Sequence, residues 1–145
     1  MEIKFSKEQI DEFQRLGVTA VYLFGSYATG QTHSLSDVDF AILLDDLGVY
    51  RTAPMDVYNK FYEIFSAVLP QEYLKKRFEL KQHEFDLIFL QEVSTRLQYE
   101  VTRDGKVLYE NDRAKRLAYE ESVLKQYCDL NYIYGIFHNS LMERI

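Results

Sequence analysis

The chain has 145 residues, 47% of them hydrophobic and 28% charged, a balance that is typical of a globular protein with one domain and excludes a disordered chain. The chain has one cysteine, Cys128, which excludes an internal disulfide and predicts a reducing, cytoplasmic location. The chain has no long apolar run, so we expect no membrane-spanning helix and no secretion signal. The formal net charge of −6 argues against general binding to DNA or RNA, because neutralising phosphates requires a basic surface.

The N-terminal segment predicts a helix and two strands joined by a polar loop. A capping box at residues 6–9, followed by apolar residues at helical spacing, predicts a helix over residues 7–16. Residues 18–24 are rich in β-branched and aromatic side chains and predict a buried strand. The polar residues 26–36 are expected to form a short helical turn and a loop, and the alternating residues 37–44 predict a second strand.

The rest of the chain predicts further helices that alternate with short strands. After a turn at residues 45–48, we expect helices over residues 54–69, 71–81 and 93–103, strands over residues 85–90 and 106–109, and a helical tail from about residue 112. This order indicates a mixed α/β (α+β) class, with a small mixed sheet flanked by helices. We expect residues 1–110 to form one domain and residues 111–145 to form a C-terminal helical tail.

The tail carries an apolar stripe with alternating spacings of four and three residues, which consists of Val123, Tyr127, Leu130, Tyr134, Phe137 and Leu141. The stripe can pack against the chain's own sheet. It can also form a helix–helix interface with a partner or with a second copy of the chain, because tyrosine is enriched at such surfaces. Gly135 lies inside the pattern and weakens the prediction of one unbroken helix.

A glycine–serine turn and three acidic residues are the candidates for chemistry. Gly25-Ser26 follows the first predicted strand, where glycine allows a sharp turn and the hydroxyl and amides can donate to phosphate. Asp37 and Asp39 share one face of the second strand, because strand side chains alternate. Asp86 lies inside a later apolar strand, where either a functional role or an edge position facing water accounts for a charge. Such carboxylates form the oxygen site that Mg²⁺ prefers, and two ions there suit phosphoryl or nucleotidyl transfer.

The spacing of these residues resembles a known signature. Gly25-Ser26, ten intervening residues and Asp37-Val38-Asp39 are similar to the motif of the DNA polymerase β-like nucleotidyltransferase superfamily, and the run Leu23–Gly30 resembles its minimal nucleotidyltransferase (MNT) branch. The resemblance covers about residues 18–110 and implies the polymerase β-like nucleotidyltransferase fold for the domain over residues 1–110. It also implies a role for each matched residue. Gly25 and Ser26 would hold the triphosphate of ATP, Asp37 and Asp39 would ligate Mg²⁺, and Asp86 would ligate one ion or take the proton of the acceptor.

One position departs from the MNT pattern. Members of this branch commonly have arginine where this chain has Thr29. If that arginine contacts phosphate in the relatives, this chain needs another cation, and the basic run Lys75-Lys76-Arg77 is a candidate. The same run is also what a solvated helix face looks like, and we favour that interpretation.

The resemblance implies an Mg²⁺-dependent enzyme that transfers AMP from ATP to a hydroxyl acceptor. Stand-alone proteins of this branch are often antitoxins that adenylylate a tyrosine of a HEPN ribonuclease toxin, so a HEPN protein is the expected partner. We expect no direct contact with nucleic acid or membrane. Two alternatives stay open: an antitoxin that neutralises its partner by stoichiometric binding, and a nucleotidyltransferase that modifies small molecules such as aminoglycosides.

Overall fold

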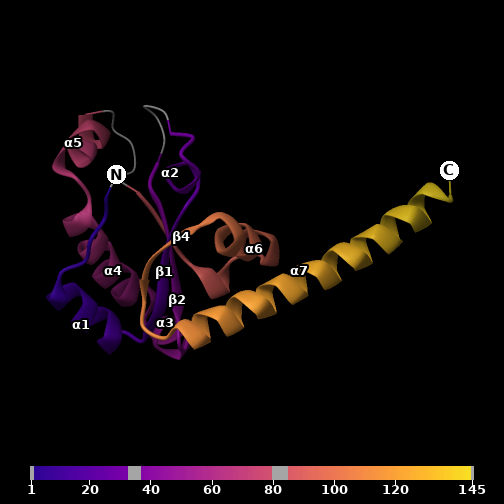
Figure 1. Cartoon of the computed structure of the whole chain (residues 1–145), viewed down its shortest axis with the longest axis horizontal. Coiled ribbons are helices and arrows are strands. Elements are labelled where there is room, and N and C mark those ends of the chain that lie inside the picture. The colour runs from indigo at the N-terminus through magenta and orange to yellow at the C-terminus, as the bar shows by residue number, and fades with distance from the viewer. Residues whose placement is uncertain (1, 33–36, 80–84, 145) are drawn as a thin grey trace.

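The computed structural model describes residues 2–32, 37–79 and 85–144, and it has the mixed α/β architecture predicted from the sequence (Figure 1). Helices lie on both sides of a central four-stranded sheet, and a long helix extends away from the body of the molecule. The elements in chain order are α1 (Lys7–Arg15), β1 (Val18–Phe24), α2 (Ser26–Thr29), β2 (Asp39–Leu44), α3 (Gly48–Thr52), α4 (Pro54–Val68), α5 (Gln71–Glu79), β3 (Asp86–Phe89), a 3₁₀ turn η1 (Leu90–Glu92), α6 (Thr95–Asp104), β4 (Lys106–Glu110) and α7 (Arg113–Met142).

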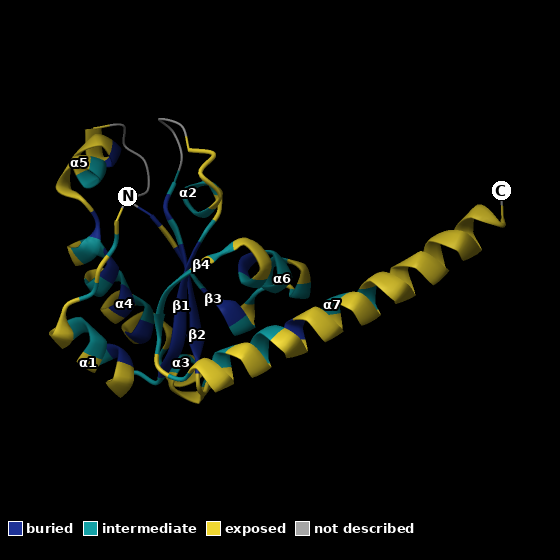
Figure 2. Ribbon diagram, viewed as in Figure 1, coloured by how far each residue is buried: buried dark blue, intermediate teal, exposed yellow. Residues whose placement is uncertain are grey.

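Helix α1 and strand β1 have the local signals that the sequence predicts. The Ser6 side chain accepts a hydrogen bond from the backbone N–H of Gln9, and the Gln9 side chain accepts one from the backbone N–H of Ser6, which completes the capping box. Strand β1 is buried over almost its whole length because it has a neighbouring strand on each side and helices over both faces. Figure 2 shows this buried centre of the molecule.

The strand order is β3-β2-β1-β4, and the sheet is mixed. Strand β1 is antiparallel to β2 and to β4, whereas β2 and β3 run parallel. Strand β3 is therefore an edge strand, and the parallel connection from β2 to β3 passes through α3, α4 and α5. This topology brings the start of β2 next to the start of β3 and next to the end of β1.

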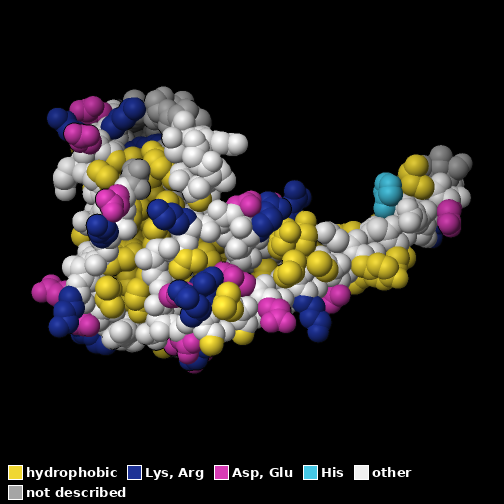
Figure 3. All heavy atoms as spheres, viewed as in Figure 1, with side chains coloured by type: hydrophobic (Ala, Val, Ile, Leu, Met, Phe, Trp, Pro, Cys, Tyr) yellow, Lys and Arg dark blue, Asp and Glu magenta, His cyan; other side chains and the backbone are white. Residues whose placement is uncertain are grey.

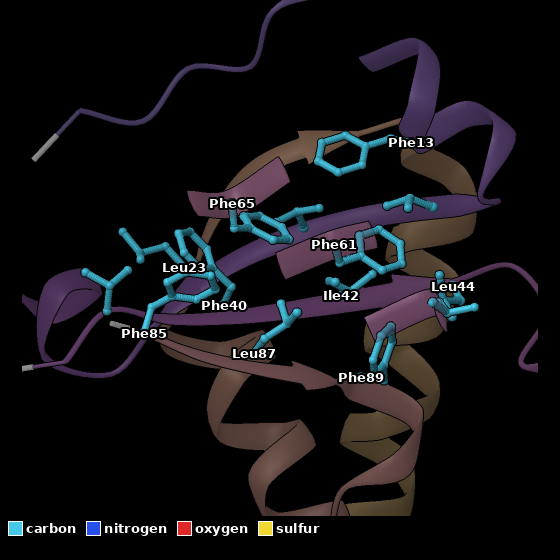
Figure 4. Close-up of a cluster of buried hydrophobic side chains, with 14 of the residues drawn as sticks. Phe13, Leu23, Phe40, Ile42, Leu44, Phe61, Phe65, Phe85, Leu87 and Phe89 are labelled. Atoms are coloured by element: carbon cyan, nitrogen blue, oxygen red, sulfur yellow. The ribbon is translucent and has the colours of Figure 1, made fainter. Parts of the chain in front are cut away.

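One face of the sheet carries the larger hydrophobic core. The predicted apolar face of the second strand is confirmed, since Val38, Phe40, Ile42 and Leu44 all lie in this core. Helices α1 and α4 cover the face, and phenylalanine side chains dominate the contact (Figure 4). The Phe40 and Phe65 rings stack with their centroids 4.4 Å apart, and Phe13 packs 6.0 Å from Phe65.

Helix α6 and the first half of α7 cover the opposite face of the sheet. Ala20, Tyr22 and Ala41 are buried there against Val101 of α6. The Tyr22 hydroxyl donates a 2.8 Å hydrogen bond to Glu120 of α7, and the Tyr99 and Tyr127 rings stack with centroids 3.9 Å apart. These contacts fix the first half of α7 to the body of the molecule.

The second half of α7 extends away from the body, and every described residue from 131 onward is exposed (Figure 2). The helix is continuous through Gly135, so the interruption that the glycine suggested does not occur. The apolar stripe predicted for the tail is divided between two environments: Val123 is 2% exposed, whereas Tyr134 and Phe137 are 60% and 62% exposed. Within the described chain, no helix is both long and apolar enough to span a membrane.

Two local differences from the expected elements have physical reasons. Residues 48–52, where the sequence predicts the end of a turn, form the short helix α3, whose Leu47 N-cap makes no side-chain capping bond. The second strand begins at Asp39 rather than at Asp37. Asp37 lies outside the ladder because β1 ends at Phe24, opposite Asp39, and the chain turns away at Gly25.

Candidate functional site

Three of the five predicted site residues lie in or directly beside one row of the sheet. Phe24, the last residue of β1, is opposite Asp39 on β2, and Asp39 is opposite Asp86 on β3. Gly25 follows Phe24 immediately. The topology therefore brings together the glycine turn and two carboxylates that come from three separate parts of the sequence.

The glycine is required by the backbone and by its neighbour. Gly25 has a φ of 74°, in the region that favours glycine, and a Cβ atom built on it would clash with Oδ2 of Asp39. The Asp39 carboxylate thus lies directly against the backbone of the turn. Ser26 follows Gly25 directly and is the first residue of α2.

The environment of Asp39 disfavours its negative charge. Burial raises the pKa of the Asp39 carboxyl to about 7, and the hydrogen bond with Asp86 and the negative charges of Asp86 and Asp37 add to the rise. A carboxyl with a raised pKa next to a second carboxylate shares a proton with it until a cation or a positive group compensates the charge. Asp86 itself is exposed on the edge strand β3 and also contacts Asp39. The edge position that faces water is therefore compatible with a place beside the other carboxylate.

Asp37 is engaged by a cation from another part of the chain. Nη1 of Arg77, on α5, lies 2.6 Å from Oδ1 of Asp37, and the guanidinium packs 5.1 Å from the centroid of the Tyr73 ring. The Arg77 side chain is 3% exposed. The preference for a solvated face at Lys75-Lys76-Arg77 is therefore wrong for Arg77, although both lysines are exposed.

The residues at the site fit a divalent cation by their chemistry. Asp37, Asp39 and Asp86 offer hard carboxylate oxygens, and Asp39 and Asp86 already share a hydrogen bond. Among the residues that the structure describes, however, no three acidic, histidine or cysteine side chains are clustered as a preformed metal site. Asp39 and Asp86 are together, while Asp37 is paired with Arg77.

A pocket of about 320 Å³ opens beside the glycine turn, between α2 and α6. Its lining combines apolar side chains of Phe24, Leu97 and Val101 with Arg103 and with the turn residue Gly25. A larger pocket of about 420 Å³ between α6 and α7 contains none of the predicted site residues. The 320 Å³ pocket also contains Glu100 and Asp104, and Gly25 is the predicted site residue in its lining.

Thr29, the position that departs from the MNT pattern, lines the same pocket. Its hydroxyl lies 3.4 Å from the carbonyl oxygens of Gly25 and of Ser26, to which it donates within α2. It therefore supplies no cation at this position. Ser36, which precedes the Asp37-Val38-Asp39 motif, lies outside the described residues.

Sequence reasoning missed the roles of Tyr73 and Arg77. The two residues are four positions apart on α5 and so share one face of the helix. The Tyr73 hydroxyl accepts a 3.0 Å hydrogen bond from the backbone N–H of Val38, and the Tyr73 ring packs edge-on against Tyr27, with centroids 6.1 Å apart. The spacing of an aromatic residue and an arginine was the available signal, but the adjacent lysines concealed it.

Comparisons with known proteins agree with this geometry. The family described as "Polymerase beta, Nucleotidyltransferase" matches residues 7–114. The "Protein adenylyltransferase MntA" of Aphanizomenon flos-aquae (strain 2012/KM1/D3) is 32% identical over 105 residues, which are 70% of this chain and 63% of that protein. The match thus spans less than two thirds of the length of that relative.

Two solved structures have the same fold. A crystal structure described as a toxin–antitoxin with AMP-PNP aligns with a TM-score of 0.59 and 22% identity, over 95% of this chain and 99% of that chain. A structure of the tri-AMPylated Shewanella oneidensis HEPN toxin in complex with MNT antitoxin aligns with a TM-score of 0.51 and 20% identity, over 94% and 98%. The predicted polymerase β-like nucleotidyltransferase fold is confirmed by these structures, and the family match over most of the chain shows that the protein belongs to the polymerase β nucleotidyltransferase family.

Proposed function

We propose that this protein is an adenylyltransferase that transfers AMP from ATP to a tyrosine hydroxyl of a HEPN ribonuclease toxin, and that it acts as the antitoxin. The observation that carries the proposal is the row of Gly25, Asp39 and Asp86 across the sheet, in a chain of this family. Similarity to a protein named as an adenylyltransferase supports AMP as the transferred group. The AMPylated HEPN toxin in one similar structure supports the class of acceptor.

In this proposal each site residue has a role in one displacement. The tyrosine oxygen attacks the α-phosphorus of ATP, the bond between the α- and β-phosphates breaks, pyrophosphate leaves, and the tyrosine proton goes to a carboxylate or to solvent. Gly25 and Ser26 hold the triphosphate, since a sharp glycine turn at the start of a helix can present backbone amides to phosphate. Asp37, Asp39 and Asp86 are the residues that would hold Mg²⁺, which supplies positive charge to the attacking and leaving oxygens when bound. Asp86 is the alternative acceptor of the proton, and its exposed position at the sheet edge supports this assignment.

The surface for the partner is the distal segment of α7, which we define as residues 130–142. This segment contains no Asp, Glu, Lys or Arg. Its exposed apolar residues include Ile133, Ile136 and Phe137, and Figure 3 shows hydrophobic side chains along this part of the helix. A helix that is apolar over much of its circumference is stable in water only when a partner buries it. The toxin is the occupant that the proposal assigns, and a second copy of this chain is the alternative.

The experiment that tests the function is labelling with ATP that is radioactive at the α-phosphate. The wild-type protein, Mg²⁺ and the labelled ATP are added to lysate of the source cell. We expect one labelled protein band, and mass spectrometry of that band is expected to find AMP on a tyrosine of a HEPN protein. The Asp37→Asn/Asp39→Asn double variant is expected to give no band, because both carboxylates are needed for the transfer.

The matched control is the Asp11→Asn/Asp56→Asn double variant. It changes the net charge by the same amount at two exposed positions on α1 and α4. We expect it to label the same band as the wild type. Label on small molecules alone would contradict the protein acceptor, and label that persists in the Asp37→Asn/Asp39→Asn variant would contradict the site.

A second candidate function is inhibition of the partner by stoichiometric binding. The exposed distal segment of α7 favours it, because an interface of this kind needs no chemistry. The two functions separate in one measurement, the ribonuclease activity of the identified HEPN partner. Inhibition that survives in the Asp37→Asn/Asp39→Asn variant, without label on any protein, would establish the binding antitoxin.

A further inference from the structure

Arg77 is a buried cation at a site that is otherwise acidic. Its side chain is 3% exposed, whereas its partner Asp37 is 44% exposed. A guanidinium at 2.6 Å from a carboxylate oxygen makes a charge-assisted hydrogen bond, which is among the stronger polar contacts in proteins. Burying an arginine is costly unless it is paired, so the fold places Arg77 there by specific contacts.

Those contacts come from aromatic residues around α5. Tyr73 lies one helical turn before Arg77, and its ring packs against the guanidinium at 5.1 Å from the centroid. The Tyr73 hydroxyl is held by the backbone N–H of Val38, the residue directly after Asp37. Tyr27 of α2 packs edge-on against the Tyr73 ring. Helix α5 is thus tied to the start of β2 and to the glycine turn, with Arg77 directed at Asp37.

Binding of a divalent cation to Asp37 is coupled to the contact between Asp37 and the Arg77 guanidinium. Asp37 would hold the metal through the same carboxylate whose Oδ1 lies 2.6 Å from Nη1 of Arg77, so the two positive groups would be separated by no more than that carboxylate. Two positive groups at that separation repel each other, and both draw on the charge of the same carboxylate. Binding of one therefore weakens binding of the other.

We infer that Arg77 is a positioning residue that competes with divalent metal for Asp37 and so raises the metal concentration at which the site assembles. This inference rests on the proposed metal-dependent transfer at the same carboxylates. When Asp37 holds a metal, Arg77 would lose its contact with Asp37, which is one of the contacts between α5 and the residues just before β2. The charge of Asp37 is thus balanced by Arg77 or by the metal, but not fully by both.

The test measures the affinity of Mn²⁺ alone, by electron paramagnetic resonance and without nucleotide. Arg77→Gln is expected to bind Mn²⁺ about tenfold more tightly than the wild type, which is the size of one charge-assisted hydrogen bond. Arg77→Lys keeps the charge and is expected to stay within about threefold of the wild type. A purely structural role for Arg77 would weaken Mn²⁺ binding in both variants, so unchanged or weaker binding in Arg77→Gln overturns the inference.

Two controls make the result specific. Lys76→Gln removes an exposed positive charge from the adjacent position on α5 and is expected to stay within about twofold of the wild type. Asp39→Asn is expected to abolish the Mn²⁺ site. If the wild type binds no Mn²⁺, the metal site of the proposed function fails and this inference fails with it. If Asp39→Asn abolishes binding but Arg77→Gln does not tighten it, the inference alone fails.

A measurement on the wild type covers the case in which Arg77→Gln does not fold. Nuclear magnetic resonance detects the guanidinium N–H protons of an ion-paired, buried arginine, because they exchange slowly with water. The spectrum of Arg77→Lys identifies the Arg77 signal. Saturation with Mg²⁺ is expected to shift this signal or to accelerate its exchange, and an Arg77 signal that is unchanged at saturation overturns the inference.

Discussion

Asp39 lies at a position where its negative charge is unfavourable for the folded chain. Partial burial, the contact with Asp86 and the proximity of Asp37 raise the pKa of its carboxyl to about 7. The unfolded chain lacks the burial and the contact with Asp86, which are the larger causes, so the carboxyl loses its proton there near the ordinary pKa of about 4. A group with a raised pKa in the folded state makes folding progressively less favourable as pH rises between these two values.

Replacing Asp39 by asparagine is therefore expected to stabilise the protein. Without divalent metal, Asp39→Asn should raise the melting temperature by a few degrees at pH 8. The gain should be absent near pH 4, grow as pH rises to about 7 and stay constant above that value. Calorimetry in EDTA from pH 4 to pH 8 measures the effect.

The control for this prediction is Asp56→Asn, at an exposed position in the first turn of α4. A negative charge near a helix N-terminus is mildly stabilising, so this variant should be neutral or slightly less stable at every pH. A gain in Asp56→Asn equal to that of Asp39→Asn would mean that net charge, and not the crowding of carboxylates, sets the effect. An unstable Asp39→Asn protein would contradict the argument directly.

Some residues of the candidate site can be predicted from the sequence, and others cannot. Gly25 and Asp39 follow from spacing alone, because a glycine at the end of a buried strand predicts a tight turn and the acidic motif predicts a carboxylate at the start of the next strand. The pairing of Asp39 with Asp86 depends on strand order, which is a property of the whole sheet. The burial of Arg77 is set by the position of α5 against β2: the spacing of Tyr73 and Arg77 puts both on one face of α5, but it does not specify what that face packs against.

At the scale of elements, the first half of α7 is fixed to the sheet by a buried tyrosine. Tyr22 is fully buried on β1, and its hydroxyl donates to Glu120, which also accepts from Arg116 at 2.8 Å. Burial and the contact with Glu120 raise the pKa of Tyr22 well above its usual range, so the hydroxyl keeps its proton and acts as a donor at any physiological pH. This bond joins two elements that are far apart in the sequence.

Removing that hydroxyl is expected to weaken the attachment without disrupting the core. Tyr22→Phe keeps the ring and loses one buried hydrogen bond, so the free energy of unfolding should fall by about 1–2 kcal/mol. Urea denaturation followed by circular dichroism measures the loss. Tyr132→Phe removes a tyrosine hydroxyl from an exposed position on α7 and should change stability by less than about 0.5 kcal/mol. Equal effects in the two variants would contradict the role of the Tyr22–Glu120 bond.

Elements with local signals are those that the sequence predicts well. Helix α1 has a capping box, α4 begins at Pro54, and α6 has Ser94 as its N-cap, whose side chain accepts from the backbone N–H of Leu97. Helix α3 lacks a side-chain cap, and the sequence does not predict it. Gly135 suggested a break in α7, yet a single glycine costs only about 1 kcal/mol and a 30-residue helix tolerates it.

At the scale of the whole molecule, the protein consists of a body and a projecting helix segment (Figure 1). The body contains both cores and the candidate site, and the distal segment of α7 extends the helix beyond it by about 20 Å. The sequence pattern placed apolar residues along the whole tail but left open whether they pack on the body. Which of these apolar residues are buried depends on where the sheet ends, and the sequence of the tail carries no information about that position.

The distal segment is expected to be dispensable for folding and necessary for recognition of the partner. A chain that ends after Asp129 loses only residues that are outside both cores, so its free energy of unfolding should change by less than about 1 kcal/mol. Its labelling of the protein acceptor from α-labelled ATP should nevertheless disappear. A large loss of stability would instead show that the segment packs against the body.

A full-length variant distinguishes the effect of removing apolar surface from the effect of shortening the chain. Ile133→Gln/Phe137→Gln removes two exposed apolar side chains from one face of α7 and keeps a residue with good helix propensity at each position. We expect it to bind Mg²⁺ and ATP as the wild type does, because the site lies in the body, and to label the acceptor at least tenfold more slowly. Asn131→Gln/Asn139→Gln, with two exposed polar positions on the same segment, should retain normal labelling. Normal labelling in the Ile133→Gln/Phe137→Gln variant would place the partner elsewhere on the body, whereas a change of this variant from dimer to monomer would assign the segment to a second copy of the chain.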